Sequence, residues 1–144
     1  MVFEQIPVGG DRNFSYLIGD PETRRAAVVD PAYAPERLLA RAAERDLEIR
    51  YLINTHGHPD HAGGNAQVLA QTSALLLQGG PGGVADGHAL ELGRILLTLI
   101  HTPGHTADSI CVLAREPGSP GRLITGDTLF VGKVGGTDFD AGAR

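Results

Sequence analysis

The order of apolar runs in the first half of the chain predicts strands, then a helix, then another strand. The segment PERLLARAAERDL, residues 35–47, gathers leucine and alanine on one helical face and arginine and glutamate on the other, which predicts an amphipathic helix. Runs rich in β-branched and aromatic residues predict strands over 14–19 and 26–30, and the Asp-Pro turn between them indicates an antiparallel hairpin. The nearly continuous apolar run 49–54 is typical of a strand whose sheet is covered on both faces. The expected fold class is therefore α/β.

Apolar runs alternate with breaks rich in glycine and proline through the rest of the chain. We expect a second helix over 62–72, and strands over 73–77, 94–101, 109–114 and 122–126. The break at 78–87 carries five glycines and a proline, which predicts a loop, and such loops often border a site. No internal repeat or shift in composition marks a boundary, so we expect a single domain over residues 1–144.

Charge and cysteine content narrow the class of partner and compartment. The formal net charge of −5, with no basic run, argues against a nucleic-acid partner. Cys111 is the only cysteine, so no intramolecular disulfide can form and a reduced cytoplasm is the expected compartment; its apolar neighbours predict a buried side chain. The longest strongly apolar stretch, 95–100, is too short to cross a bilayer, so we expect no membrane association.

Three of the six histidines fall within one short segment, THGHPDHAGG, as His56, His58 and His61, with Asp60 among them. Two histidines two residues apart in an extended segment point to the same side, so His56 and His58 can hold one metal ion. Pro59 disfavours helix before it and suits the entry to a turn, after which Asp60 and His61 face elsewhere and can hold a second ion. The alternative is a polar loop with solvated histidines.

Further candidate ligands follow two later strands. His101 and His105 lie in HTPGHTADS, between two predicted strands, and Asp127 follows the strand candidate RLITG. Strand ends and the loops after them are where α/β proteins usually place chemistry. Taken alone, an aspartate after glycine indicates a turn, but beside a histidine cluster Asp127 is a candidate ligand.

The motifs THGHPDHAGGN, HTPGHT and TGDTLF, in this order, resemble the metal-binding motifs of the metallo-β-lactamase superfamily. The resemblance is greatest to the glyoxalase II-like and persulfide dioxygenase-like branch, and it runs from about Phe14 to the C-terminus. It implies an αβ/βα sandwich, in which two mixed sheets lie face to face with helices outside and the metals at one edge.

The resemblance also implies a metal-binding role for six side chains. It assigns His56, His58 and His105 to a first metal, Asp60 and His61 to a second, and Asp127 to both. His101 is implied to be a strand-end residue that does not bind metal, and His88 a surface or structural residue. Imidazole and carboxylate ligands suit one or two zinc ions, with iron or manganese as alternatives.

The implied activity is hydrolysis of a small-molecule thioester of the hydroxyacylglutathione type by a metal-bound hydroxide. Zinc lowers the pKa of bound water from 15.7 toward about 7. Asp60 is implied to be catalytic, orienting this hydroxide and accepting its proton.

Two other functions are open at this point. An iron-dependent persulfide dioxygenase would use His56, His105 and Asp127 as ligands. In the resembled dioxygenases an arginine commonly precedes a later Thr-Asp pair, whereas this chain has Gly136 at that position. The segment DHAGGN is also closer to the glyoxalase II form. A metal-binding module without catalytic activity is the second alternative.

The pattern departs from the family after Asp127. The family completes the second metal site with a later histidine in a Gly-His context, and no histidine follows Asp127 in this chain. We therefore expect the chain to be a C-terminally incomplete fragment; a natural short form and an inactive copy are the alternatives. The sequence leaves the oligomeric state open.

Overall fold

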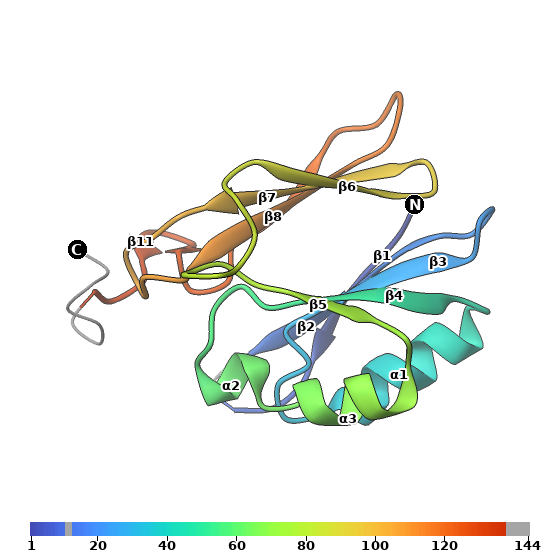
Figure 1. Cartoon of the computed structure of the whole chain (residues 1–144), viewed down its shortest axis with the longest axis horizontal. Coiled ribbons are helices and arrows are strands. Elements are labelled where there is room, and N and C mark those ends of the chain that lie inside the picture. The colour runs from blue at the N-terminus through green and yellow to red at the C-terminus, as the bar shows by residue number, and fades with distance from the viewer. Residues whose placement is uncertain (11–12, 138–144) are drawn as a thin grey trace.

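The computed structural model places the strands in two sheets that lie face to face, with helices against the outer face of the first sheet (Figure 1). It describes residues 1–10 and 13–137. The first sheet has the order β1-β2-β3-β4-β5 and is formed by β1 (Val2–Pro7), β2 (Phe14–Asp20), β3 (Arg25–Val29), β4 (Glu48–Ile53) and β5 (Leu75–Leu77). The second has the order β6-β7-β8-β9 and is formed by β6 (His88–Leu92), β7 (Ile95–His101), β8 (Ile110–Arg115) and β9 (Arg122–Ile124). The remaining elements are α1 (Pro35–Glu44), α2 (Pro59–Ala62), α3 (Asn65–Gln71) and the short hairpin of β10 (Leu129–Phe130) and β11 (Lys133–Val134).

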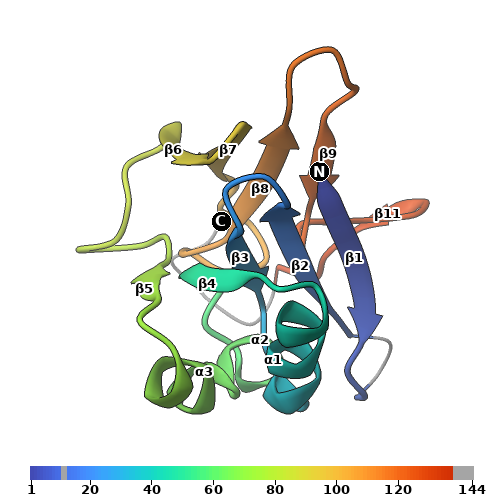
Figure 2. The same ribbon diagram turned by 90° about the vertical axis from the view of Figure 1, so that its right-hand side faces the viewer.

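The first sheet is mixed, and both of its faces are buried. β1, β2 and β3 pair antiparallel, whereas β3 pairs parallel to β4 and β4 parallel to β5, with α1 and α3 in the two crossovers (Figure 2). Ala26 and Val28 of β3 pack in the core beneath the helices, and Ala27 and Val29 pack in the core between the sheets. Successive residues of a strand face opposite sides of its sheet. The unbroken apolar run of β3 therefore serves two separate cores.

The second sheet is antiparallel and contributes one face to the core between the sheets. Leu97 and Leu99 of β7 are fully buried, whereas Leu96, on the opposite side of the strand, is 43% exposed. This alternation is typical of a strand with one face against a core. The predicted sandwich of two sheets is confirmed, although in the described part of the chain the helices cover only the first sheet.

Helix α1 begins at Pro35 as predicted but ends at Glu44, three residues before the predicted end. Leu38 and Ala42 are buried on its apolar face. Asp46 adopts a left-handed conformation with φ of 54°, which stops the helix, and the amide of Leu47 then donates a hydrogen bond to the carbonyl of Ala42 (2.8 Å). Leu47 remains buried, so the apolar face was correctly predicted even where the helix was not.

The predicted helix over 62–72 is present as α3 from Asn65 to Gln71, and the residue before Gly63 is instead the end of a separate short helix, α2. The amide of Ala32 donates to the carbonyl of His61 (2.9 Å), which ties α2 to the loop before α1. The apolar pattern does not predict β1, β6 or the β10–β11 hairpin. All the strands that it does predict are present. None of the helices in the described ranges is long and apolar enough to cross a membrane.

The end of the sandwich away from α2 is held together by a buried carboxylate. Asp20, 4% exposed, accepts hydrogen bonds from the amide of Glu22 (3.1 Å), the hydroxyl of Thr23 (3.0 Å) and the amide of Arg94 in the opposite sheet (3.0 Å). Gly93 has a φ of +61°, and a β-carbon there would overlap the Asp20 carboxylate. Burial alone would raise the pKa of Asp20, but these hydrogen bonds outweigh it and lower the pKa.

Replacing Asp20 is expected to loosen this junction. Because Asp20→Ala removes a buried acceptor from the amides of Glu22 and Arg94 and from the hydroxyl of Thr23, we expect a loss of about 1–3 kcal/mol in the free energy of unfolding at pH 7, measured by urea denaturation. The pKa of Asp20 is lowered in the folded state, so this stabilisation is complete above its unfolded-state pKa of about 3.9 and disappears as the pH falls through the lower folded-state value.

Glu22→Ala is the matched control, because it removes an exposed ion pair (Glu22 to Arg94, 2.8 Å) across the same junction. We expect it to cost less than about 1 kcal/mol. Equal losses for the two variants would contradict the role given to the buried carboxylate.

Candidate metal centre

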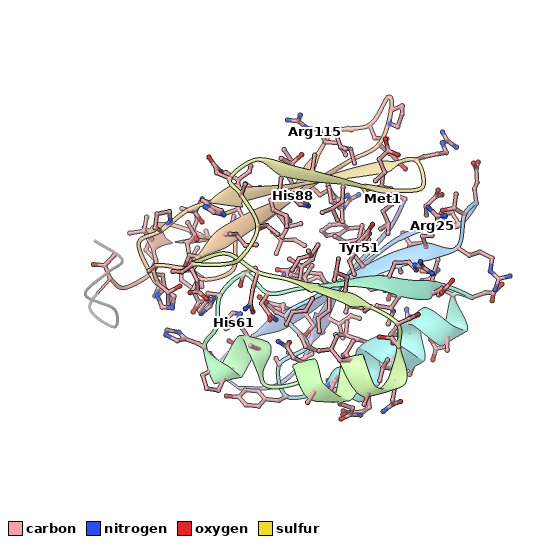
Figure 3. All side chains as sticks on the ribbon, in the orientation of Figure 1. Met1, Arg25, Tyr51, His61, His88 and Arg115 are labelled. Atoms are coloured by element: carbon pink, nitrogen blue, oxygen red, sulfur yellow. The ribbon has the colours of Figure 1, made fainter. Side chains whose placement is uncertain are left out.

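The predicted ligands come from three loops that meet at one end of the sandwich. These loops follow β4 in the first sheet and β7 and β9 in the second. Figure 3 labels His61 beside α2 at this end, opposite the end where Met1 and Arg25 lie. Here the amide of Ile110 donates to the carbonyl of Thr55 (2.8 Å), so a backbone hydrogen bond joins the two sheets directly beside the histidines.

His56, His58 and His105 bring three imidazole nitrogens together, as predicted for a first metal. His58 Nδ1 lies 3.2 Å from His56 Nε2 and 3.3 Å from His105 Nε2. Asp127 Oδ2 lies 3.3 Å from His105 Nε2 and 3.9 Å from His56 Nε2. In a tetrahedral zinc site with Zn–N bonds of 2.0–2.1 Å, neighbouring ligand atoms are about 3.3–3.4 Å apart. Three of these four separations match that spacing, whereas Asp127 lies farther from His56 and is grouped with His56 and His61 instead.

His61 and Asp127 form the centre of a second donor group, and Asp60 lies at its margin. His61 Nε2 is 3.3 Å from Asp127 Oδ1 and 3.8 Å from Asp60 Oδ2. It is buried without a hydrogen bond in the structure as described, because its approach to Asp127 lacks hydrogen-bond geometry. A buried ring nitrogen of this kind is expected where a metal ion is to be bound. Asp127, with one oxygen toward each group, lies where a bridging ligand would.

Asp30 orients His61 from behind. The Nδ1–H of His61 donates to Asp30 Oδ2 (2.9 Å), which leaves Nε2 facing Asp127. The amide and hydroxyl of Thr55 donate to the same carboxylate, at 2.8 and 2.6 Å. A carboxylate on the far ring nitrogen fixes the tautomer and the ring plane of a metal-binding histidine.

Two other contacts hold the ligand loops. The Nδ1–H of His105 donates to the carbonyl of Gly136 (2.8 Å), which directs its Nε2 toward His58. Asn54 and Asn65 exchange side-chain amide hydrogen bonds of 3.0 and 2.6 Å. Because these two asparagines bracket the segment that carries His56 to His61, their pairing closes the base of the ligand loop.

The surroundings set opposite protonation for two of the buried histidines. Burial, with the nearby His61, lowers the pKa of His56 to about 4, so its ring is neutral and its lone pair is available at neutral pH. Burial also acts to lower the pKa of His61, but the carboxylates of Asp127 and Asp30 on either side of the ring outweigh it and raise the pKa to about 10. A metal ion bound at His61 would therefore displace a proton.

Asp60 is only partly enclosed, with a side chain 40% exposed. The side-chain amide of Asn13 donates both to its carbonyl (2.8 Å) and to its Oδ2 (3.0 Å). Burial acts to raise the pKa of Asp60, but the Asn13 hydrogen bond and the nearby His61 lower it. Asp60 is thus ionised and faces the second donor group.

The two remaining histidines lie outside the donor groups, as predicted. His101 is the last residue of β7, and its Nε2–H donates to the carbonyl of Val84 (2.8 Å) in the glycine-rich loop. Its amide also donates to Asp86 Oδ1 (2.8 Å), so His101 fastens this loop to the second sheet. His88 is exposed at the start of β6.

Sequence reasoning missed Asp30, Asn13 and the Asn54–Asn65 pair. Asp30 directly follows the apolar strand β3, which is the same signal that identified Asp127 after β9, and it could have been found that way. Asn13 and the asparagine pair carry no such local signal.

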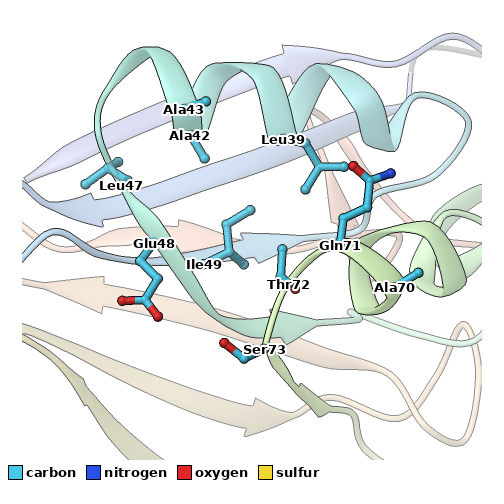
Figure 4. Close-up of a pocket in the computed structure, with 10 residues that line it drawn as sticks. All are labelled: Leu39, Ala42, Ala43, Leu47, Glu48, Ile49, Ala70, Gln71, Thr72 and Ser73. Atoms are coloured by element: carbon cyan, nitrogen blue, oxygen red, sulfur yellow. The ribbon is translucent and has the colours of Figure 1, made fainter.

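A groove of about 620 Å³ lies between α1, α3 and β4 (Figure 4). It is lined by small and apolar side chains such as Leu39, Ala42, Ile49 and Thr72, and Glu48 is the one titratable residue in its lining. It therefore lacks the chemistry of the histidine end.

Comparison with known sequences points the same way as the geometry. Residues 8–77 match the model of the metallo-β-lactamase superfamily. Over 141 residues the chain is 38% identical to the hydroxyacylglutathione hydrolase of Nitrosococcus oceani, and the match covers 90% of this chain and 52% of that protein. It is 35% identical over 140 residues to the cytoplasmic isozyme of hydroxyacylglutathione hydrolase from Saccharomyces cerevisiae, covering 88% of this chain and 51% of that protein. The chain thus spans about half the length of these relatives.

Solved structures share the sandwich. ETHE1 from Myxococcus xanthus superposes with a TM-score of 0.85 at 34% identity, over 99% of this chain and 64% of that one. A metallo-β-lactamase from Staphylococcus aureus superposes with a TM-score of 0.84 at 30% identity, over 96% of this chain and 47% of that one. The motifs, the sandwich and these matches agree in relating this chain to the metallo-β-lactamase superfamily, whose fold it shares.

Proposed function

We propose that this chain carries the metal centre of a hydrolase that cleaves a small-molecule thioester of the hydroxyacylglutathione type. The observation that carries the proposal is the cluster of three imidazole nitrogens from His56, His58 and His105, with a carboxylate oxygen of Asp127 3.3 Å from His105. The adjacent group of His56, His61 and Asp127, with Asp60 at its margin, supports a second ion beside the first. We propose zinc for both, because it is commonly bound by imidazole and carboxylate donors.

A zinc ion held here would supply a nucleophilic water at neutral pH and would polarise the scissile carbonyl. The role of the chain is to present the ligands and to handle the proton. His56, neutral at pH 7, binds without first losing a proton. Asp60 is ionised, partly exposed and next to His61, so it is placed to orient the attacking water and accept its proton.

The substrate class rests on the relatives. Proteins from Nitrosococcus oceani and Saccharomyces cerevisiae that match nearly all of this chain are named hydroxyacylglutathione hydrolases. The yeast relative is also named a cytoplasmic isozyme, which supports a cytoplasmic location for this chain.

The geometry favours this hydrolase over an iron-dependent dioxygenase. A site of two histidines and one carboxylate would use His56, His105 and Asp127 and would need open positions for oxygen and substrate. Here His58 Nδ1 lies within 3.3 Å of the donor nitrogens of both other histidines, so a third imidazole already faces that space. A set of three histidines and a shared carboxylate agrees better with a hydrolytic zinc centre.

The segment after β11 supports the first donor group. Gly136 accepts the hydrogen bond from His105, and the amide of Gly135 donates to the carbonyl of Thr128 (3.3 Å). A β-carbon at Gly135 would overlap the carbonyl oxygen of Asp127. Only glycine therefore lets this segment pass close enough to orient His105.

Removal of the metal tests the proposed activity. We expect the purified chain to hydrolyse an S-(hydroxyacyl)glutathione, to lose this activity when a chelator removes the metal, and to regain it with added zinc. Thioester absorbance follows turnover, and elemental analysis follows the metal. Bound iron with oxygen uptake would favour the dioxygenase instead, and bound zinc without turnover would indicate a non-catalytic metal-binding module.

The role of Asp60 can be separated from that of the first donor group. We expect Asp60→Ala to lower turnover by about 10²–10⁴-fold, the usual contribution of a positioned acid or base. The first equivalent of zinc should bind as in the wild type, because Asp60 lies outside that group. Glu91→Ala, at an exposed position of β6, is the control and should leave turnover and zinc binding unchanged. Unchanged turnover in Asp60→Ala would refute the proposed mechanism.

The contact of Gly135 with Asp127 predicts a specific effect on metal affinity. Gly135→Ala should displace the carbonyl that holds His105 and weaken binding of the first zinc by about 10–100-fold, as measured by competition with a chelator. Gly104→Ala is the matched control, since it adjoins His105, has no left-handed φ and has no atom within 4 Å of its β-carbon position. Wild-type affinity in Gly135→Ala, or equal losses in both variants, would argue against this support.

A further inference from the structure

One asparagine from the loop before β2 reaches across to the first turn of α2. Its two amide hydrogens go to two acceptors on a single residue, because Asn13 Nδ2 lies 2.8 Å from the carbonyl oxygen of Asp60 and 3.0 Å from its Oδ2. A donor pair that grips both the main chain and the side chain of one residue fixes the carboxylate relative to its own backbone. Rotation of the Asp60 side chain would break one of these bonds.

The backbone of Asn13 is itself anchored. Its carbonyl accepts from the amide of Val8 (3.2 Å), and its amide donates to the carbonyl of Gly9 (3.3 Å). Val8 is 3% exposed and belongs to a small apolar cluster with Ala32 and Ala34. The backbone that carries the Asn13 amide is therefore held by hydrogen bonds to a segment that includes the buried residue Val8.

Asp60 needs such a partner more than the buried ligands His56 and His61 do. The side chains of His56 and His61 are 1% and 5% exposed, so packing holds them, whereas the side chain of Asp60 is 40% exposed. A half-exposed carboxylate loses rotational freedom when it is held in one rotamer, and this loss opposes metal binding unless the rotamer is set beforehand. The Asn13 amide is a contact that sets it.

We propose that Asn13 is a positioning residue, whose amide holds Asp60 in the rotamer that binds the second metal ion beside His61 and Asp127. This inference rests on the metal-dependent function proposed above. It acts through Asp60 alone, since Asn13 is not among the residues of the first donor group. Loss of the amide should therefore weaken the second ion selectively.

The test is a titration of the metal-free, purified chain with Co²⁺ or Zn²⁺. Calorimetry gives the stoichiometry and the affinity of each equivalent, and the visible absorption of Co²⁺ reports the ligand geometry at each. Two variants are compared with the wild type: Asn13→Ala removes the amide, and Asn13→Asp keeps its shape but sets a carboxylate against Asp60. Gln5→Ala, on β1, is the control, because it removes a side-chain amide hydrogen bond to the hydroxyl of Tyr16 in β2 (3.1 Å), away from the donor groups.

We expect the first equivalent to bind alike in all four proteins. The second should bind about 10–100-fold more weakly in both Asn13 variants, with an altered Co²⁺ spectrum for that equivalent, and normally in Gln5→Ala. The urea midpoint of each metal-free variant shows whether the fold is intact.

Three results would overturn the proposal. The first is a wild-type chain that binds a single metal equivalent. The second is that the Asn13 variants bind both equivalents as the wild type does. The third is that both equivalents bind more weakly and the urea midpoint falls, which would show that Asn13 only stabilises the fold. The outcome is independent of the proposed activity: selective loss of the second ion in a chain without thioesterase turnover would reject the hydrolase and retain the role of Asn13.

Discussion

A negative charge that is excluded from water must be surrounded by hydrogen-bond donors, and the Asp30 carboxylate, 1% exposed, imposes this requirement on the loops around it. Thr55 supplies two donors and His61 a third. Removal of Asp30 would take an acceptor from all three donors at once. Thr55 and His61, near the two ends of the segment that carries the clustered histidines, are thereby bound to the same carboxylate.

The strands themselves contribute no ligand; they carry loops whose positions are set by contacts between the sheets. The carbonyl of Thr55 accepts from Ile110 of the second sheet, while the amide of Asn54 donates to Leu77 of the first (3.1 Å). The histidine loop is thus bonded to both layers. A site at such a junction can draw ligands from distant parts of the sequence without any of the strands being distorted.

The candidate ligands stand out in the sequence because their signal is local, whereas most of the residues that support them carry no local signal. His56, His58 and His61 share one short motif, and chain order alone brings them near each other. Asn13 meets Asp60 across 47 residues, and only the folded packing of the loop before β2 against α2 reveals the contact. The same reasoning applies to the end of α1, since the amphipathic pattern continues through Leu47 while the left-handed backbone of Asp46 ends the helix. Periodicity identifies a buried face, but it does not register a turn that returns the chain to that face.

The two ends of the sandwich are restrained by different kinds of interaction. At the end away from α2, Asp20 receives the amide of Arg94 from the facing sheet, and the N-terminal ammonium of Met1 lies 2.7 Å from Glu116 beyond β8 (Figure 1). At the other end the facing layers present imidazoles and carboxylates to one another. One end of the sandwich is therefore joined by contacts that need no ion. At the other end, beside the hydrogen bond between Thr55 and Ile110, the two layers meet through side chains that a metal ion would bind together, so such an ion would also act as a cross-link between the sheets.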